Sequence, residues 1–188
     1  LSRQVAGDSA TILEQSLIST QYPPAAGEPD RAEVLRAFAA SKGVPVTADL
    51  ERVWFELQRE MVASGQVARY KANVVQPGGE SAQGDVVRVG PFTAVSDGKV
   101  LQYMPALQSL NVYPRQPPQE ILDYVKNLEA ATEGYVQAVV DSSRGVLMAL
   151  YVERPTWSQR IEHGEGINYV ILAVGLIAFL AFLWQLAY

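Results

Sequence analysis

The chain has 188 residues, with 15 basic and 20 acidic side chains and a formal net charge of −5. This acidic balance argues against a nucleic-acid partner, because binding to nucleic acid calls for a basic surface. The absence of cysteine excludes disulfides, thiol nucleophiles and cysteine-ligated metal sites. The length suffices for one modest domain with a separate helical arm.

The first part of the chain predicts helices joined by a linker. Apolar residues recur at roughly helical spacing from Val5 to Ile18, and a segment rich in proline and glycine follows from Tyr22 to Pro29. A second helix is predicted from Asp30 to Ala40. Asp30 is placed to cap it, and Glu33 completes a capping-box-like pair.

The most regular helical pattern runs from Thr47 to Ala63, with Thr47 as the expected N-cap. Its apolar positions fall at i, i+3, i+4, i+7 and i+11, which predicts one buried face: Leu50, Val53, Trp54, Leu57 and Met61. Phe55 points elsewhere. The glutamates of this helix are expected on a solvated face: Glu51, Glu56 and Glu60.

The hydrophobic pattern changes from helical to alternating after Gly65. An Asp97-Gly98 pair between two apolar runs indicates a type I′ hairpin turn, which needs positive φ. The result is a small antiparallel sheet of about four or five strands, which needs helices covering one face for stability. The predicted strands are Ala68–Val74, Asp85–Val89, Phe92–Val95, Lys99–Met104 and Leu110–Tyr113.

The segment after the sheet mixes helical and strand signals. Pro117-Pro118 opens a helix whose apolar face begins at Ile121 and ends at Leu128. Tyr135 to Val140 resembles a strand. The short apolar run from Val146 to Val152 fits either a strand or a helix, and its residue types favour a helix.

The C-terminal segment, residues 167–188, predicts a single transmembrane helix. It carries no charge, and about 20 residues at about 1.5 Å each span the roughly 30 Å hydrocarbon core of a bilayer. Tyr169 at its start and Trp184 and Tyr188 at its end are the expected interfacial anchors, with Trp157 at the membrane surface. A buried core helix is the alternative. No basic excess precedes the segment, which favours an N-terminal domain outside the cytoplasm.

The residues predict neither an enzyme nor a cofactor or metal site. Asp141 and Ser142 lie in a predicted turn, Asp141–Gly145, and a nucleophilic serine needs a base within hydrogen-bond reach. His163 is the only histidine and is distant in sequence, so capping by Asp141 is the favoured reading. His163 itself is either a pH sensor or a solvated loop residue.

The sequence therefore predicts an α+β protein with a helical N-terminal part, a small antiparallel β-sheet domain with covering helices, and a single C-terminal transmembrane helix. Its expected organisation is an N-terminal helix at 1–22, a helical segment at 23–65, an α+β domain at 66–154, a juxtamembrane segment at 155–166 and the membrane helix at 167–188.

Several strings stand out by their order: Val53–Met61, Val87–Tyr103, Leu128–Thr132, and Asp141–Gly145 leading to Pro155-Thr156. Together they resemble the N-terminal periplasmic extension and first transmembrane helix of a subgroup of the MotA/TolQ/ExbB proton-channel family. The resemblance implies a bacterial inner-membrane subunit with its N-terminus in the periplasm. It also implies an ExbD/TolR-like partner, a TonB-like protein, a homo-oligomer that is commonly a pentamer, and use of the proton gradient to energise TonB-dependent outer-membrane transport.

The sequence departs from that family after Tyr188, where the cytoplasmic loop and pore-lining helices are not present. We therefore expect the chain to be the N-terminal part of a longer protein, and no proton-path residue can be assigned to an uncharged helix. The alternative is a membrane-anchored periplasmic binding or scaffold module without transport activity. In either case Phe55, Tyr103 and Trp157 are candidate partner contacts, although packing in the core or at the membrane interface is the favoured interpretation of each.

Overall fold

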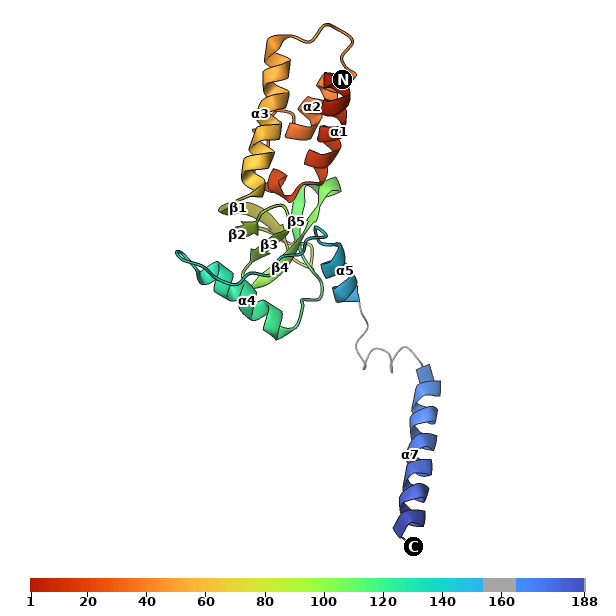
Figure 1. Ribbon diagram of the computed structural model, residues 1–188. Helices are drawn as coiled ribbons and strands as arrows, with labels where there is room; N and C mark the ends of the chain where they lie inside the picture. Colours follow the sequence, from red (N-terminus) through yellow and green to blue (C-terminus); the bar gives the residue numbers. More distant parts are fainter. Residues whose placement is uncertain (154–164, 188) are drawn as a thin grey trace. The chain divides into compact units, whose positions relative to one another are not determined.

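A computed structural model of the chain describes residues 1–153 and 165–187. It divides into two units, Leu1–Val152 and Glu153–Tyr188. The first unit combines a helical arm with a closed five-stranded barrel (Figure 1), which confirms the α+β class. The helices of the arm are α1 (Ser2–Gln15), the short 3-10 helix η1 (Leu17–Gln21), α2 (Arg31–Ala40) and α3 (Thr47–Ser64).

The arm is held together by small residues on α1 that let α2 approach closely. Ala6, Ala10 and Leu13 recur at helical spacing and are buried together with Leu35 and Phe38 of α2. Asp30 is the N-cap of α2, where its carboxylate accepts a hydrogen bond from the N–H of Glu33 at 2.6 Å. The predicted cap is thereby confirmed.

The start of α3 differs from the prediction. Thr47 is already helical, and the N-cap is Val46, which has no side-chain hydrogen-bonding group. The Asp49 carboxylate accepts from the N–H of Val46 at 3.3 Å instead. A carboxylate in the first turn also interacts favourably with the positive end of the helix dipole, so a cap at Thr47 is not needed.

The buried face of α3 is only in part the predicted one: Val53 is buried and Leu57 is partly buried against the same core, but three predicted positions are not. Leu50, Trp54 and Met61 are 44%, 63% and 74% exposed. The buried residues are Val53, Glu56 and Ala63, so the helix is turned toward the side that carries its carboxylates. The physical reason is a buried arginine on α2, described below, which these carboxylates satisfy.

The barrel contains β1 (Val67–Val75), β2 (Ser81–Val89), β3 (Thr93–Ser96), β4 (Lys99–Met104) and β5 (Ser109–Val112). Neighbours in sequence pair antiparallel, whereas β1 and β5 pair parallel through Val74 with Leu110 and Val75 with Asn111. Four of the five strand pairings are antiparallel, as predicted, whereas the parallel pair that closes the barrel was not predicted. Closure by a parallel pair covers a sheet edge that would otherwise be open.

Two local strand predictions are confirmed. Asp97 and Gly98 have φ angles of 52° and 69°, as a type I′ turn requires. Exposure along β1 alternates with the expected period of two and ends at the buried Val74. β2 begins at Ser81 rather than Asp85, because it pairs with β1 along its whole length.

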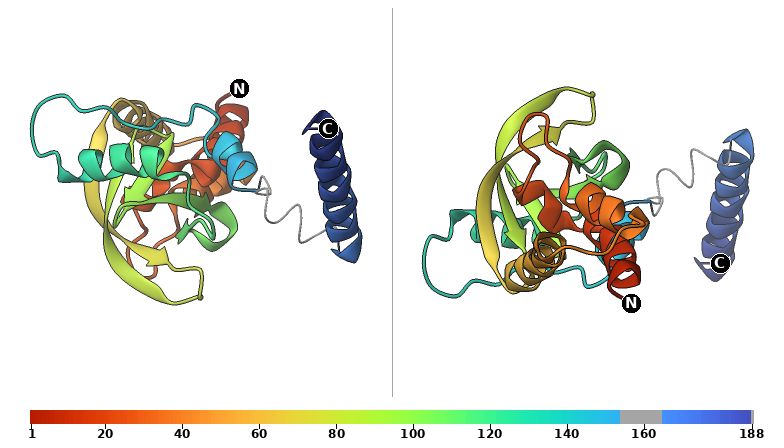
Figure 2. Two further views of the ribbon diagram at one scale, coloured as in Figure 1. Left: turned by 90° about the horizontal axis from the view of Figure 1, so that it is seen from below. Right: turned by 90° about the horizontal axis from the view of Figure 1, so that it is seen from above.

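The barrel packs against the arm through its interior and against two helices through the outer face of its wall. Leu17 of η1 packs with barrel residues that include Val86, Leu101 and Leu110, so the arm closes one end of the barrel interior. Two further helices, α4 (Gln119–Ala130) and α5 (Val146–Glu153), lie on the other side (Figure 2). Val125 of α4 and Met148 of α5 share a core with Val95 and Val100 of the barrel wall. The helical prediction for Val146–Val152 is confirmed.

The strand predicted at Tyr135–Val140 is absent, and the segment has no regular secondary structure. Tyr135, Val136 and Val140 are exposed. The five strands pair with one another, and the segment is held by Ala138 and Val139, which pack against the α4–α5 core. Residues 135–140 are therefore held by side-chain packing and not by the backbone hydrogen bonds that a strand would make.

The second unit contains α7 (Glu165–Ala187). Within the described part of the chain, no helix is both long enough and apolar enough to pass through a membrane. The transmembrane helix expected at residues 167–188 therefore stays a prediction. Trp157, His163 and Tyr188 lie outside the described residues.

Candidate functional site

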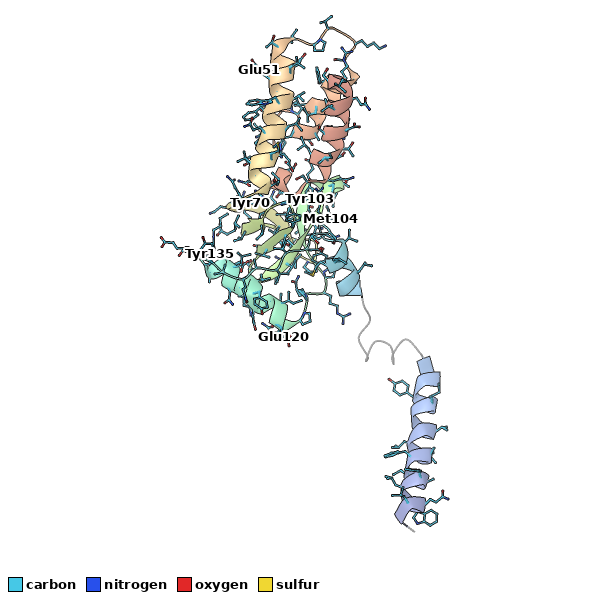
Figure 3. All side chains as sticks on the ribbon, viewed as in Figure 1. Glu51, Tyr70, Tyr103, Met104, Glu120 and Tyr135 are labelled. Atoms are coloured by element: carbon cyan, nitrogen blue, oxygen red, sulfur yellow. The ribbon has the colours of Figure 1, made fainter. Side chains whose placement is uncertain are left out.

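The arm meets the barrel along a polar contact, which we call the arm–barrel junction. It is formed by η1 and the loop after it, the start of α2, the second half of α3 and the facing ends of β1, β2 and β4. Tyr70 and Tyr103 lie there (Figure 3). The Tyr103 hydroxyl donates to the backbone oxygen of Glu14 at 3.2 Å, and the hydroxyls of Tyr70 and Thr20 are 2.5 Å apart.

A buried ionic cluster lies beside this junction. Arg31 Nε is 2.7 Å from Glu56 Oε2, and Arg31 Nη2 is 2.9 Å from Glu60 Oε2. The side chains of Arg31 and Glu56 are only 7% and 8% exposed. Arg59 pairs with the second oxygen of Glu56, and Ser16 donates to Glu60. Two arginines and two carboxylates thus neutralise one another, as buried charges require.

Aromatic rings extend the same cluster. The guanidinium carbon of Arg59 lies 4.8 Å from the centre of the Tyr22 ring and 4.9 Å from that of Phe55. Arg31 lies 5.6 Å from the Tyr22 ring. These distances are within the range of cation–π attraction. The loop that carries Tyr22 is therefore fastened to both α2 and α3.

Arg88 of β2 links the barrel to the arm. It is fully buried; its Nη1 donates to the backbone oxygens of Ala63 at 3.1 Å and Gly90 at 2.6 Å, and its Nη2 to Gln21 Oε1 at 2.6 Å. Burial lowers the pKa of Arg88, and the nearby Tyr70, Tyr22 and Glu60 oppose this shift.

Glycine is required where the end of α3 touches the barrel. Gly90 has a φ of +53°, and a Cβ added there would lie 2.8 Å from the backbone oxygen of Ser64. Any larger residue at position 90 would strain the local backbone, and its Cβ would also collide with the backbone oxygen of Ser64. This close approach brings the carbonyls of Ala63 and Gly90 within reach of one guanidinium.

A cavity of about 190 Å³ opens at the arm–barrel junction. Burial raises the pKa of Tyr103 in its wall, with the carboxylates of Asp30 and Glu14 adding to the shift. Its remaining polar wall includes Lys71, Asn73 and Gln83. Such a wall offers hydrogen bonds to a small polar group or a peptide segment. Ser19 also lines the cavity, where Arg31 Nη1 donates to its hydroxyl at 3.4 Å. A guanidinium stays protonated, so Arg31 cannot act as the base that a nucleophilic serine needs.

The turn Asp141–Gly145 is a structural cap. The Asp141 carboxylate accepts from the N–H of Ser143 at 2.9 Å, the Ser143 hydroxyl at 2.5 Å and the N–H of Met148 at 3.0 Å. The N–H of Asp141 donates to Thr93 Oγ1 at 3.1 Å. Ser142 is exposed. The turn therefore fastens α5 to β3, and the capping interpretation of Asp141 is confirmed.

Asp141 is expected to make stability depend on pH. Burial alone would raise the pKa of Asp141, but its hydrogen bonds from Ser143, Met148 and Gly145 outweigh burial and hold the pKa below its usual value. Its contribution is therefore present above the unfolded pKa of about 3.9 and is lost as the pH falls through the lower folded pKa. We expect Asp141→Ala to cost about 2 kcal/mol at neutral pH, with a smaller cost in acid.

Urea denaturation of the wild type and the Asp141→Ala variant between pH 7 and pH 3 measures this difference. Asp123→Ala is the matched control, because Asp123 is 62% exposed and 3.9 Å from Lys126, an arrangement that contributes little. A difference between wild type and Asp141→Ala that grows in acid would contradict the prediction.

The described residues that were singled out from the sequence belong to three different elements. Tyr169 and Trp184 are exposed on α7, whereas Phe55 belongs to α3 and Tyr103 to the cavity wall. Among residues 1–153 and 165–187, no group of three or more His, Asp or Glu side chains is arranged to hold a metal ion.

The sequence reasoning missed the charged residues at the junction: Arg31, Glu56, Glu60 and Arg88. A signal for two of them was present, because Val53, Glu56, Glu60 and Ala63 follow helical spacing as closely as the apolar set does. For Arg88 the only signal was a charge between Val87 and Val89 in a strand. Comparisons of the chain with protein families, with curated proteins and with solved structures find no match.

Proposed function

We propose that this chain is the periplasmic domain and first membrane helix of a proton-motive-force-driven inner-membrane complex that energises TonB-dependent outer-membrane transport. The observation that carries the proposal is the ordered set of strings from Val53–Met61 to Asp141–Gly145 ahead of an uncharged C-terminal helix. The partners we propose with it are an ExbD/TolR-like subunit and a TonB-like protein. The location we propose is the bacterial inner membrane.

Three of the four strings that support the resemblance also meet in space. Val87, Val95 and Val100 of the longest string share one core with Leu128 of another. Asp141 of the last string accepts the hydrogen bonds that cap α5, and its N–H donates to Thr93. A set of motifs that forms one packing unit is what a fold shared with that family would need.

The role proposed for α7 rests on its length and composition. Its 23 residues extend roughly 34 Å at about 1.5 Å each, and a bilayer core is about 30 Å thick. No charged residue follows Glu165. The proposal that α7 spans a bilayer rests on the sequence of the whole segment, residues 167–188, which carries no charge.

Membrane attachment is tested by fractionation. We expect the chain to stay with bacterial membranes after carbonate washing and to be released only by detergent. A variant with Gly175→Arg and Leu176→Arg is expected to lose this attachment, because an arginine in the middle of a spanning helix costs about 3 kcal/mol. Wild-type chain that washes off with carbonate would overturn the membrane role.

The transport role is tested by co-purification and by uptake. We expect the protein purified from membranes to bring an ExbD/TolR-like subunit with it, and deletion to stop siderophore uptake through a TonB-dependent receptor. If deletion leaves uptake unchanged and no such subunit co-purifies, the transport role fails. The second candidate, a membrane-anchored binding or scaffold module, would then stand, and the cavity at the arm–barrel junction favours it.

A further inference from the structure

We propose that α3 is the surface through which two copies of this chain associate. The feature that leads to this proposal is an apolar stripe along α3, which we call the α3 stripe: Leu50, Trp54, Phe55, Gln58, Met61 and Val62. Every member is exposed, with Trp54 at 63%, Phe55 at 53% and Val62 at 55%. The stripe lies on the opposite side of α3 from the buried Glu56.

The area of the α3 stripe matches what a stable dimer needs. Aromatic side chains bury about 150–250 Å² each when covered, so Trp54 and Phe55 together still present roughly 200 Å². With the aliphatic members the apolar surface is on the order of 400 Å², the size of the largest apolar patch on a typical monomer, which is often functional. A standard interface takes about 800 Å² from each partner, of which roughly 57% is apolar.

The distribution of charge along α3 also fits an interface. The middle of the stripe, from Trp54 to Met61, has no exposed carboxylate or lysine on its own face. Glu51 lies at the end of α3 far from the barrel (Figure 3), and Arg59 is only partly exposed because it pairs with Glu56. A centre depleted of charge with charged residues at its rim is the composition of a protein interface.

The side chains of the stripe favour a second copy of α3 as the partner that packs on it. In an antiparallel pair with Gln58 facing Gln58, Trp54 of each copy faces Val62 of the other, and Phe55 faces Met61. Each large ring thus meets a smaller side chain, as close packing requires. The two central amides can hydrogen-bond, because a glutamine side chain both donates and accepts. Antiparallel helices also align their dipoles favourably.

Cysteine cross-linking of the full chain in membranes tests this arrangement directly, because the chain has no cysteine. We expect Gln58→Cys to form a disulfide-linked dimer readily. We also expect co-expressed Trp54→Cys and Val62→Cys chains to cross-link with each other far more than either does alone. Glu120→Cys, on an exposed position of α4 (Figure 3), is the control and is expected to give only background.

A charge exchange at the centre gives a second, independent measurement. Gln58→Glu and Gln58→Lys each place two like charges on the two-fold axis, and each is expected to abolish cross-linking between co-expressed Phe55→Cys and Met61→Cys chains. Co-expression of the Glu and Lys variants is expected to restore it. Circular dichroism is expected to be unchanged, because Gln58 is exposed.

The outcomes separate this proposal from the transport role. If Gln58→Cys cross-links no more than the Glu120→Cys control, the antiparallel contact is overturned, even if an ExbD/TolR-like subunit co-purifies. The same holds if every single-cysteine variant of the stripe forms a disulfide with its own copy to an equal extent. Cross-linking of position 58 to another protein or to lipid instead of a second copy would overturn it as well. Cross-linking as expected without any transport partner would leave the dimer standing and count against the transport role alone.

Discussion

Replacing Glu56 with alanine is expected to destabilise the unit Leu1–Val152 by about 3–5 kcal/mol, because it leaves a buried arginine without its partner. Glu56 accepts from Arg31 Nε at 2.7 Å and pairs with Arg59 through its other oxygen. Glu60 alone cannot satisfy both guanidinium groups. Chemical denaturation of the full chain, followed by circular dichroism, measures the loss.

Glu51→Ala is the matched control for this substitution. It removes the same side chain from the same helix, but Glu51 is exposed, so we expect a change within about 0.5 kcal/mol. The double substitution Arg31→Met with Glu56→Leu is expected to recover most of the loss, because a buried ion pair is often replaced by apolar side chains without cost. Equal effects of Glu56→Ala and Glu51→Ala would show that the cluster does not stabilise the arm.

Local sequence patterns predicted turns and helix caps well, because these features depend on residues that are close together in the sequence. The Asp97-Gly98 turn follows from the positive φ angles that a two-residue hairpin needs. Asp30 caps α2 and Asp141 caps α5 because a short carboxylate next to free N–H groups satisfies them. These residues act on neighbours in the sequence, so the sequence alone sufficed.

The orientation of α3 could not be predicted from its own pattern. Two faces compete on this helix: an apolar one with Trp54 and Met61, and a mixed one with Val53 and Glu56. The choice depends on Arg31, which is far from α3 in sequence and buried by tertiary packing. A rule that places apolar residues inside therefore centred the buried face wrongly, because three of the residues that it selected, Leu50, Trp54 and Met61, belong to the exposed α3 stripe.

Closure of the barrel could not be predicted from the sequence either. Each strand was found from its own alternation, but the parallel pairing of β1 with β5 joins residues far apart in the chain. Long-range pairing depends on how the strands twist and on what fills the interior. Here Leu17 of η1 contributes to that filling, and nothing in its local sequence marks it as part of the barrel.

Replacing Arg88 with methionine is expected to cost about 3 kcal/mol, and to do so by separating the arm from the barrel. Arg88 donates to the buried carbonyls of Ala63 and Gly90 and to Gln21. Each buried acceptor left without a donor costs about 1–3 kcal/mol, and methionine can fill the space but cannot donate. Hydrogen exchange measures this separation, because amides of α3 are expected to lose protection while those of β4 and β5 keep theirs.

Arg69→Met is the control that separates the effect of burial from the number of hydrogen bonds that an arginine side chain donates. Arg69 also donates to backbone carbonyls, those of Leu128, Glu129 and Ala131 at the end of α4, but Arg69 is exposed, so water can replace its donors. We expect a cost of at most about 1 kcal/mol. Arg88→Lys is expected to fall between the two, because one ammonium keeps the charge but lacks the planar fork that reaches several acceptors at once. Equal loss of protection in the arm and the barrel on Arg88→Met would mean that the two unfold as one body and that Arg88 stabilises both alike.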